Sequence, residues 1–187
     1  MKNNLSNSDI AYYISELLKY NKIKNICICP GSRNTPLTLS FINNSYFNCT
    51  HHIDERSSAY FSLGISKRLQ KPSTIITTSG TAVGNLFPAI IESDLSMTPL
   101  IIITADRPKT LIGTGENQAI KQDTIFKDFV RASIHIEEEK INNSSFLNSL
   151  QSMVDKCMGI DKKYPPGPIH INVSFKEPII DLLKIKK

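Results

Sequence analysis

The stretch Leu100-Ile101-Ile102-Ile103-Thr104-Ala105-Asp106-Arg107-Pro108 decides the fold class. Its first half is almost wholly aliphatic and rich in β-branched side chains, which is typical of a strand buried on both faces of a parallel sheet. Its second half becomes polar within a few residues, as expected where such a strand ends and a loop begins. The sequence therefore predicts a strand over residues 100–104 that leads into a polar turn.

The same change from apolar strand to polar turn and helix recurs along the chain. Further strands are expected at residues 26–29, 47–53, 74–78, 129–136 and 169–173. Helical periodicity or start signals mark residues 8–20, 35–43, 54–70, 82–93 and 142–158. The alternation predicts an α/β fold with three layers, α/β/α, around a six-stranded, mostly parallel sheet. Ser6 with Asp9 is expected to form a capping box, and Asp54 to cap the helix that follows it.

Length and composition fit one domain and exclude several functional classes. The chain has 187 residues and a mild net charge of +5, without a basic stripe interleaved with aromatics, so we expect no nucleic-acid partner. The four cysteines lack the spacing of metal ligands, so we expect no metal site formed by this chain. No signal-peptide apolar region or membrane-spanning run is visible, which predicts a cytoplasmic protein without a membrane span. P-loop, dinucleotide-fingerprint and G-x-S-x-G motifs are also missing.

Four polar segments follow four of the expected strands. They are Cys29-Pro30-Gly31-Ser32-Arg33-Asn34, His52-Ile53-Asp54-Glu55-Arg56-Ser57, Thr78-Ser79-Gly80-Thr81-Ala82 and Thr104-Ala105-Asp106-Arg107-Pro108. In an open parallel sheet, ligands bind outside the carboxyl ends of the strands. The four segments therefore predict one shared site.

Glu55 has a structural and a functional interpretation. As a first-turn acid it would be favoured by the helix dipole. As a buried carboxyl group at a ligand-binding edge it would be desolvated, which would raise its pKa. Because Asp54 already suffices as the cap, Glu55 is available for a functional role.

The remaining candidates also have two interpretations each. The segment Ser79-Gly80-Thr81 is either a tight turn or a helix start whose N–H groups meet a ligand. Arg33 and Arg107 are either surface ion pairs or a clamp for carboxylates at one sheet edge. Asn117 and Gln118 lie in a glycine-bearing loop over residues 109–122, where polar side chains are ordinary.

Taken in order, these motifs resemble the amino-terminal part of the MenD family, the 2-succinyl-5-enolpyruvyl-6-hydroxy-3-cyclohexene-1-carboxylate synthases. These are thiamine diphosphate enzymes. The resemblance covers about residues 8–180. It includes residues 29–33, 54–57, 78–83 and 104–108 from the four segments and their flanks, and three more: Gln118-Ala119-Ile120-Lys121-Gln122, Gly167-Pro168-Ile169-His170-Ile171-Asn172 and Phe175-Lys176-Glu177-Pro178. It implies the thiamine diphosphate-binding fold, with residues 1–180 as the pyrimidine-binding domain and residues 181–187 as the start of an interdomain linker or tail.

The resemblance also implies roles for individual residues. Glu55 matches the glutamate that hydrogen-bonds the cofactor's aminopyrimidine ring and promotes formation of the ylid. The other implied cofactor contacts are Pro30, Ser79, Gly80 and Thr81. The implied substrate contacts are Ser32, Arg33, Arg107, Asn117 and Gln118. The family decarboxylates 2-oxoglutarate and adds the succinyl carbanion to isochorismate in menaquinone biosynthesis.

The family's diphosphate and metal motif, G-D-G…N, is missing from this sequence. By resemblance, Mg²⁺ or Mn²⁺ would be held by the diphosphate-binding domain of a neighbouring subunit in a homo-oligomer. We therefore expect a fragment that carries half of each active site and is inactive alone. One alternative is the pyrimidine-binding subunit of a two-chain thiamine diphosphate-dependent oxo-acid decarboxylase. Another is a non-catalytic α/β binding or assembly module, in which Glu55 would be dispensable.

Overall fold

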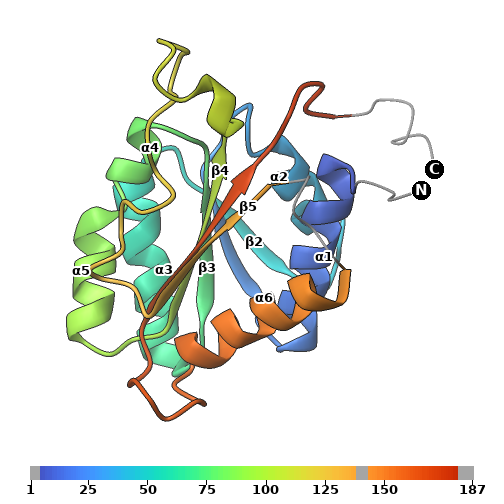
Figure 1. Ribbon diagram of the computed structural model, residues 1–187. Coiled ribbons are helices and arrows are strands. Elements are labelled where there is room, and N and C mark those ends of the chain that lie inside the picture. Colours follow the sequence, from blue (N-terminus) through green and yellow to red (C-terminus); the bar gives the residue numbers. More distant parts are fainter. Residues whose placement is uncertain (1–4, 138–142, 181–187) are drawn as a thin grey trace.

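The computed structural model describes residues 5–137 and 143–180, and it has a six-stranded sheet between two layers of helices (Figure 1). The strand order is β2-β1-β3-β4-β6-β5, and each neighbouring pair is parallel. The strands are β1 (Asn25–Ile28), β2 (Asn48–His51), β3 (Ser73–Thr77), β4 (Leu100–Asp106), β5 (Ala132–Ile136) and β6 (Pro168–Ser174). The predicted α/β class is confirmed, and the sheet is wholly rather than mostly parallel.

Helices cover both faces of the sheet, as the three-layer prediction requires. One face carries α1 (Asn7–Tyr20), α2 (Thr35–Ile42) and α6 (Asn143–Cys157). The other face carries α3 (Glu55–Leu69), α4 (Thr81–Gly84) and α5 (Phe87–Leu95). A short 3₁₀ turn, η1 (Lys109–Leu111), follows β4.

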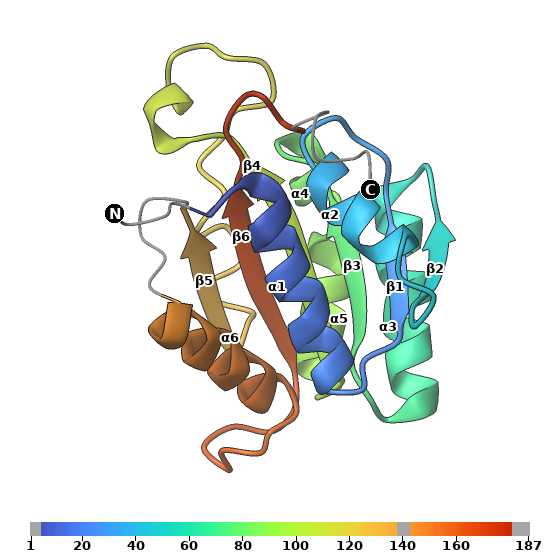
Figure 2. The ribbon, with the colours of Figure 1, turned by 90° about the vertical axis from the view of Figure 1, so that its right-hand side faces the viewer.

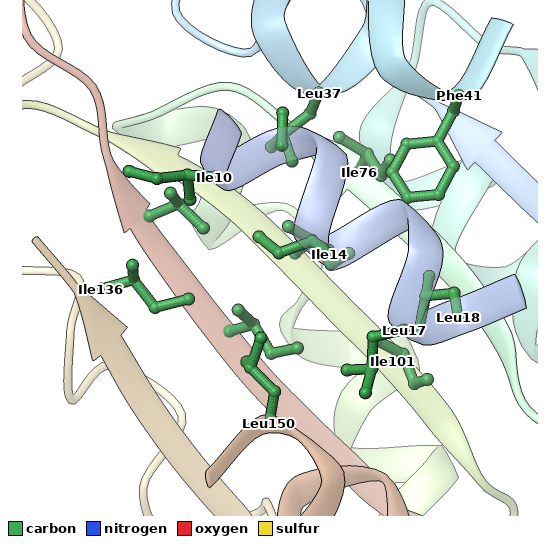
Figure 3. Packing of buried hydrophobic residues seen from close by; sticks show 14 of the residues in the cluster. Ile10, Ile14, Leu17, Leu18, Leu37, Phe41, Ile76, Ile101, Ile136 and Leu150 are labelled. Atoms are coloured by element: carbon green, nitrogen blue, oxygen red, sulfur yellow. The ribbon is translucent and has the colours of Figure 1, made fainter. Parts of the chain in front are cut away.

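Side chains alternate between two hydrophobic clusters because successive strand residues point to opposite faces. Ile101 and Ile103 of β4 pack with α1, α2 and α6, whereas Leu100 and Ile102 pack on the side of α3 and α5. Figure 3 shows Ile10 and Ile14 of α1 in the first cluster. Both faces of β4 are therefore buried, which explains why its sequence is a continuous aliphatic run.

Both predicted helix starts are confirmed. Ser6 accepts a hydrogen bond from the Asp9 N–H, and the Asp9 carboxylate accepts from the Ser6 N–H at 2.8 Å, which is a capping box. Asp54 Oδ1 accepts from the Ser57 N–H at 2.7 Å at the start of α3. Because Asp54 satisfies the end of the helix, the first helical residue, Glu55, is not needed as a cap.

The predicted helix over residues 82–93 is wrong, because two helices occupy this stretch. Helix α4 ends at Gly84 and α5 begins at Phe87, with Pro88 in its first turn. Pro88 has no N–H to donate to the Gly84 carbonyl, and its ring would clash with that group in a continuous helix. The break places Asn85 at the end of α4.

Several predicted boundaries also change. The strand expected at 129–136 begins at Ala132, because Phe129 and Val130 pack beside the second cluster instead. The strand expected at 47–53 is limited to β2. The predicted start, at residue 142, of the helix expected over residues 142–158 and the proposed linker at 181–187 lie outside the described residues. In the described part of the chain, no helix is long and apolar enough to cross a membrane.

Candidate functional site

Three of the polar segments follow β2, β1 and β3, whereas the fourth begins inside β4, which extends to Asp106 rather than ending at residue 104. These four strands are successive neighbours in the sheet. Since these strands are parallel, all four segments lie at one edge. In Figure 2, η1 and the segment after β6 lie at the same end of the molecule as α4 and the start of α2. The topology thus brings the candidate residues to a common edge, as the sequence predicts.

Arg107 is at the centre of the most buried part of this edge, and its side chain is only 8% exposed. Its Nη1 donates to the Ser79 hydroxyl and to the Gln118 carbonyl oxygen, the latter at 3.2 Å. Its Nε has no hydrogen-bond partner among the described residues, and the Glu116 carboxylate lies 4.0 Å away. We call Ser79, Gly80, Arg107, Gln118 and Gln122 the Arg107 cluster. The Arg107 guanidinium is hydrogen-bonded to two neutral oxygens, and the Glu116 carboxylate is its ion-pair partner.

Gly80 is required by the close approach of two loops. Its φ is +77°, and a Cβ here would lie 2.8 Å from the Cβ of Gln118. The Gly80 N–H donates to Gln122 Oε1 at 3.1 Å. For Gly80, the geometry therefore favours the tight-turn interpretation, because its amide is already bonded within the chain.

Gln122 holds the Arg107 cluster against the sheet, although the sequence analysis gave it no role. Its side chain is fully buried, and its Nε2 donates to the Ala105 carbonyl oxygen and to Asn172 Oδ1, both at 2.8 Å. Asn172 Nδ2 in turn donates to Asp106 Oδ2 at 2.7 Å. Polar residues inside otherwise apolar strand sequences, such as Asn172, are the signal that could have revealed this network.

Burial controls the ionisation of the groups beneath the cluster. It raises the pKa of the Asp106 carboxyl, although hydrogen bonds from Asn172 and from the Arg107 N–H oppose the shift. It lowers the pKa of His170 to about 3, and His135 adds to the shift. His170 is therefore neutral near pH 7, and its Nε2 hydrogen-bonds the Thr104 hydroxyl at 2.7 Å.

Arg33 approaches the same edge from the turn after β1. Its Nη1 donates to the Phe175 carbonyl oxygen at 3.0 Å and pairs with Glu177 Oε1 at 3.1 Å. Burial is the main cause that lowers its pKa, and the nearby charge of Arg107 acts in the same direction. Because arginine stays protonated in proteins, Arg33 remains a desolvated cation.

Glu55 lies at the first turn of α3, and its carboxylate Oε2 accepts from Asn85 Nδ2 at 3.0 Å. The residue is half-buried in this chain, so the expectation of a buried carboxyl group is wrong for the chain by itself. Among the described residues, none donates a hydrogen bond to its other oxygen, Oε1. We call Glu55 and Asn85 the Glu55 pair.

Other predicted site residues lie at the surface of this edge. Pro30, Ser32, Thr81, Asn117 and Gln118 are all exposed. Gln118 nevertheless contributes its carbonyl oxygen to Arg107, which depends on its backbone conformation with φ of +54°.

Within residues 5–137 and 143–180, no group of three His, Cys, Asp or Glu side chains could hold a metal ion. This edge of the sheet carries one acid, Glu55, and two cationic side chains, Arg33 and Arg107. These groups suit a ligand that has a ring nitrogen and carboxylates.

Comparison with known proteins relates this chain to enzymes that use thiamine pyrophosphate. Residues 8–125 match the family model "Thiamine pyrophosphate enzyme, N-terminal TPP binding domain". Among curated relatives, 2-succinyl-5-enolpyruvyl-6-hydroxy-3-cyclohexene-1-carboxylate synthases from Haemophilus ducreyi and Histophilus somni are 43% and 46% identical to this chain. The matches cover 90% and 89% of this chain but only 29% of each relative. The chain thus spans less than a third of the length of these relatives.

A solved structure shares the fold. Benzoylformate decarboxylase from Polynucleobacter necessarius superposes with a TM-score of 0.74 over 88% of this chain and 29% of that chain, at 19% identity. Since the family model matches well over half of the chain, this chain belongs to the family of thiamine pyrophosphate enzyme N-terminal, TPP-binding domains.

Proposed function

We propose that residues 1–180 form the pyrimidine-binding domain of a synthase that decarboxylates 2-oxoglutarate and adds the succinyl unit to isochorismate in menaquinone biosynthesis. The observation that carries the proposal is the gathering of Arg33 and Arg107 at the same sheet edge as Glu55. Both proposed substrates carry carboxylates, which guanidinium groups bind through charge-assisted hydrogen bonds. The names of the 37–46% identical relatives support the same function.

The residues at this edge fit thiamine diphosphate. When bound, the cofactor supplies a nucleophilic carbon and an electron sink for decarboxylation. Glu55 Oε1 would form a hydrogen bond with a ring nitrogen of the aminopyrimidine, since Oε2 is already bonded to Asn85. Pro30, Ser79, Gly80 and Thr81 would form the wall beside the ring. Because Glu55 is only half-buried here, a second surface has to cover it and exclude water.

The arginines would bind and orient the substrates. Arg107 is the more buried cation, and its Nε is buried without a hydrogen-bond partner among the described residues. Arg33 pairs with the exposed carboxylate of Glu177. A hydrogen bond to a charged group contributes about 1.5–3 kcal/mol, so two such cations would provide much of the affinity for a dicarboxylate. The exposed side chains of Ser32, Asn117 and Gln118 would add neutral hydrogen bonds around it.

The second surface would be the diphosphate-binding domain of a neighbouring subunit in a homo-oligomer. That domain would hold the diphosphate and Mg²⁺ or Mn²⁺ through its G-D-G motif. The four cysteines of this chain are free thiols, which supports the proposed cytoplasmic location.

A chimera would test the proposal. This chain would replace the matching amino-terminal part of the Haemophilus ducreyi relative, which is 43% identical over 172 residues. We expect the chimera to release carbon dioxide from 2-oxoglutarate only as fast as it consumes isochorismate. The unmodified relative is the control for assembly.

The isolated chain should show neither turnover nor tight cofactor binding. A pyrimidine ring offers few contacts to offset an association cost of about 4–15 kcal/mol. A chimera that binds thiamine diphosphate but prefers another oxo acid, or decarboxylates 2-oxoglutarate without consuming isochorismate, would contradict the proposal. The second result would point to an oxo-acid decarboxylase.

A further inference from the structure

The segment after β6 places an acidic side chain on one of the site's arginines. Glu177 Oε1 lies 3.1 Å from Arg33 Nη1, while Glu177 Oε2 accepts a hydrogen bond from the Ile179 N–H at 3.1 Å. A single carboxylate thus connects a cation of the site to the chain segment that leaves the sheet.

The two partners are in very different environments. The side chain of Arg33 is 12% exposed, whereas that of Glu177 is 69% exposed. The guanidinium therefore needs a counter-ion, because a poorly hydrated charge is costly without one. Glu177 gains little from the pairing, since water can solvate its carboxylate equally well. The pair is consequently easy to separate if another carboxylate reaches Arg33.

The backbone of this segment is fixed independently of Glu177. Asn7 Nδ2 on α1 lies within hydrogen-bond distance of three carbonyl oxygens, those of Lys176 at 2.8 Å, Pro178 at 3.2 Å and Ile179 at 3.1 Å. Arg33 also binds the Phe175 carbonyl oxygen. The Glu177 side chain can therefore swing away from Arg33 while its backbone stays in place.

We propose that Glu177 is an exchangeable counter-ion of Arg33, which occupies the position of a substrate carboxylate and leaves when the substrate binds. The identity of that substrate, a dicarboxylate such as 2-oxoglutarate, rests on the proposed function. The exchange sets specificity, because only an anion restores the negative charge that Arg33 loses when Glu177 moves away. A neutral analogue would have to leave Arg33 paired with Glu177. The Ile179 N–H loses its acceptor in the same step, so its environment reports on occupancy of Arg33.

The energy involved is small and has a definite sign. Because the Glu177 carboxylate is well hydrated, we assign the pair the contribution of an exposed ion pair, about 0.2–1 kcal/mol. Removing the competing carboxylate should therefore tighten anion binding by about 1.4- to 5-fold. A residue that merely positioned Arg33 would have the opposite effect, because its removal would weaken binding.

The test is a titration of this chain with 2-oxoglutarate, followed by ¹⁵N–¹H spectra of the Arg33 Nε–H and the Ile179 N–H. In the wild type we expect both signals to shift with one dissociation constant. In Glu177→Gln the constant should fall by about 1.4- to 5-fold, and the Ile179 signal should no longer respond.

Glu116→Gln is the matched control, because it removes the same charge beside Arg107 without a contact to Ile179. It should leave the response of Ile179 intact.

Inorganic phosphate serves as a second probe that separates this proposal from the proposed function. If phosphate shifts both signals and 2-oxoglutarate shifts neither, the exchange stands and the proposed substrate is wrong. If 2-oxoglutarate binds the wild type and Glu177→Gln with equal affinity and the Ile179 N–H signal does not shift, the exchange is wrong. The proposed function is not affected by that result. Failure of both anions to bind either variant also overturns the exchange, because Arg33 would then not be an anion site.

Discussion

The Arg107 cluster and the Glu55 pair lie at the same sheet edge but are built differently. The Arg107 side chain is almost fully buried, and its contacts come from the turn after β3 and from the loop after β4. The Glu55 pair is a single hydrogen bond between a half-buried carboxylate and an exposed amide. The chain thus completes the arginine side of the site by itself and leaves the acid side open.

This difference separates stability from chemistry. Substitutions in the Arg107 cluster should affect folding and substrate binding together, since the guanidinium is also a structural donor. Substitutions in the Glu55 pair should affect chemistry alone, because little of the fold depends on one half-exposed hydrogen bond.

The sharpest expected separation comes from Glu55→Gln in the chimera. Turnover should fall by about 10²- to 10⁴-fold, the usual contribution of a positioned acid–base group. The amide can still bond Asn85, so the thermal midpoint of this chain should not change. Glu92→Gln, an exposed substitution on α5, is the control. Near-normal turnover of Glu55→Gln would show that Glu55 has no part in the chemistry.

Arg107→Ala and Arg33→Ala compare the two cations directly. Each should lower kcat/KM by about one to two powers of ten, from the loss of a charged hydrogen bond. Arg107→Ala should also destabilise the chain, because Ser79 and the Gln118 carbonyl lose their donor. Steady-state kinetics of the chimera and urea unfolding of the chain measure the two effects. Equal losses of stability in both variants would contradict the distinction, and exposed Arg56→Ala provides the baseline.

Gly80→Ala tests whether the cluster depends on close loop packing. The added methyl group would meet Gln118 at 2.8 Å and requires a positive φ, so stability should fall by about 1–3 kcal/mol. Gly84→Ala in α4 is the matched control, because a Cβ added there would have nothing within 4 Å and the variant should gain about 0.4–1 kcal/mol. Urea unfolding measures both. If Gly80→Ala leaves the free energy of unfolding unchanged, the loop that carries Gln118 can move away at little cost.

The most gradual expected effect, spread over several pH units, is a dependence of stability on pH from His170 beneath the cluster. Burial lowers its pKa in the folded chain from 6.5 to about 3, so the unfolded chain binds more protons between these values. Stability is therefore highest above pH 6.5 and falls as the pH drops towards 3, by about 1.4 kcal/mol per pH unit at most. Urea unfolding of the wild type should show a steeper loss than His170→Gln. Exposed His51→Gln should keep the wild-type slope, and equal slopes in all three would contradict the assignment.

Much of the fold could be predicted because its signals are local. The aliphatic run at Leu100, the capping box at Ser6 and the cap at Asp54 each depend on neighbours within a few residues. The signal for the break at Pro88 is equally local, and the prediction of one helix over residues 82–93 is wrong because a proline cannot continue the helical hydrogen bonds.

The sequence by itself determined that polar turns follow parallel strands and therefore share one edge. It did not determine which side chains meet there. The bond between Asn85 and Glu55 spans 30 residues, and that between Gln122 and Asn172 spans 50. Arg33 contacts a carbonyl 142 residues away. Such contacts depend on the strand order β2-β1-β3-β4-β6-β5, which sets β6 beside β4. Hydrophobic periodicity fixes which face of a strand is buried, but only packing of the whole chain selects its neighbour, so the partners of Arg33 and Arg107 were decided by the tertiary structure.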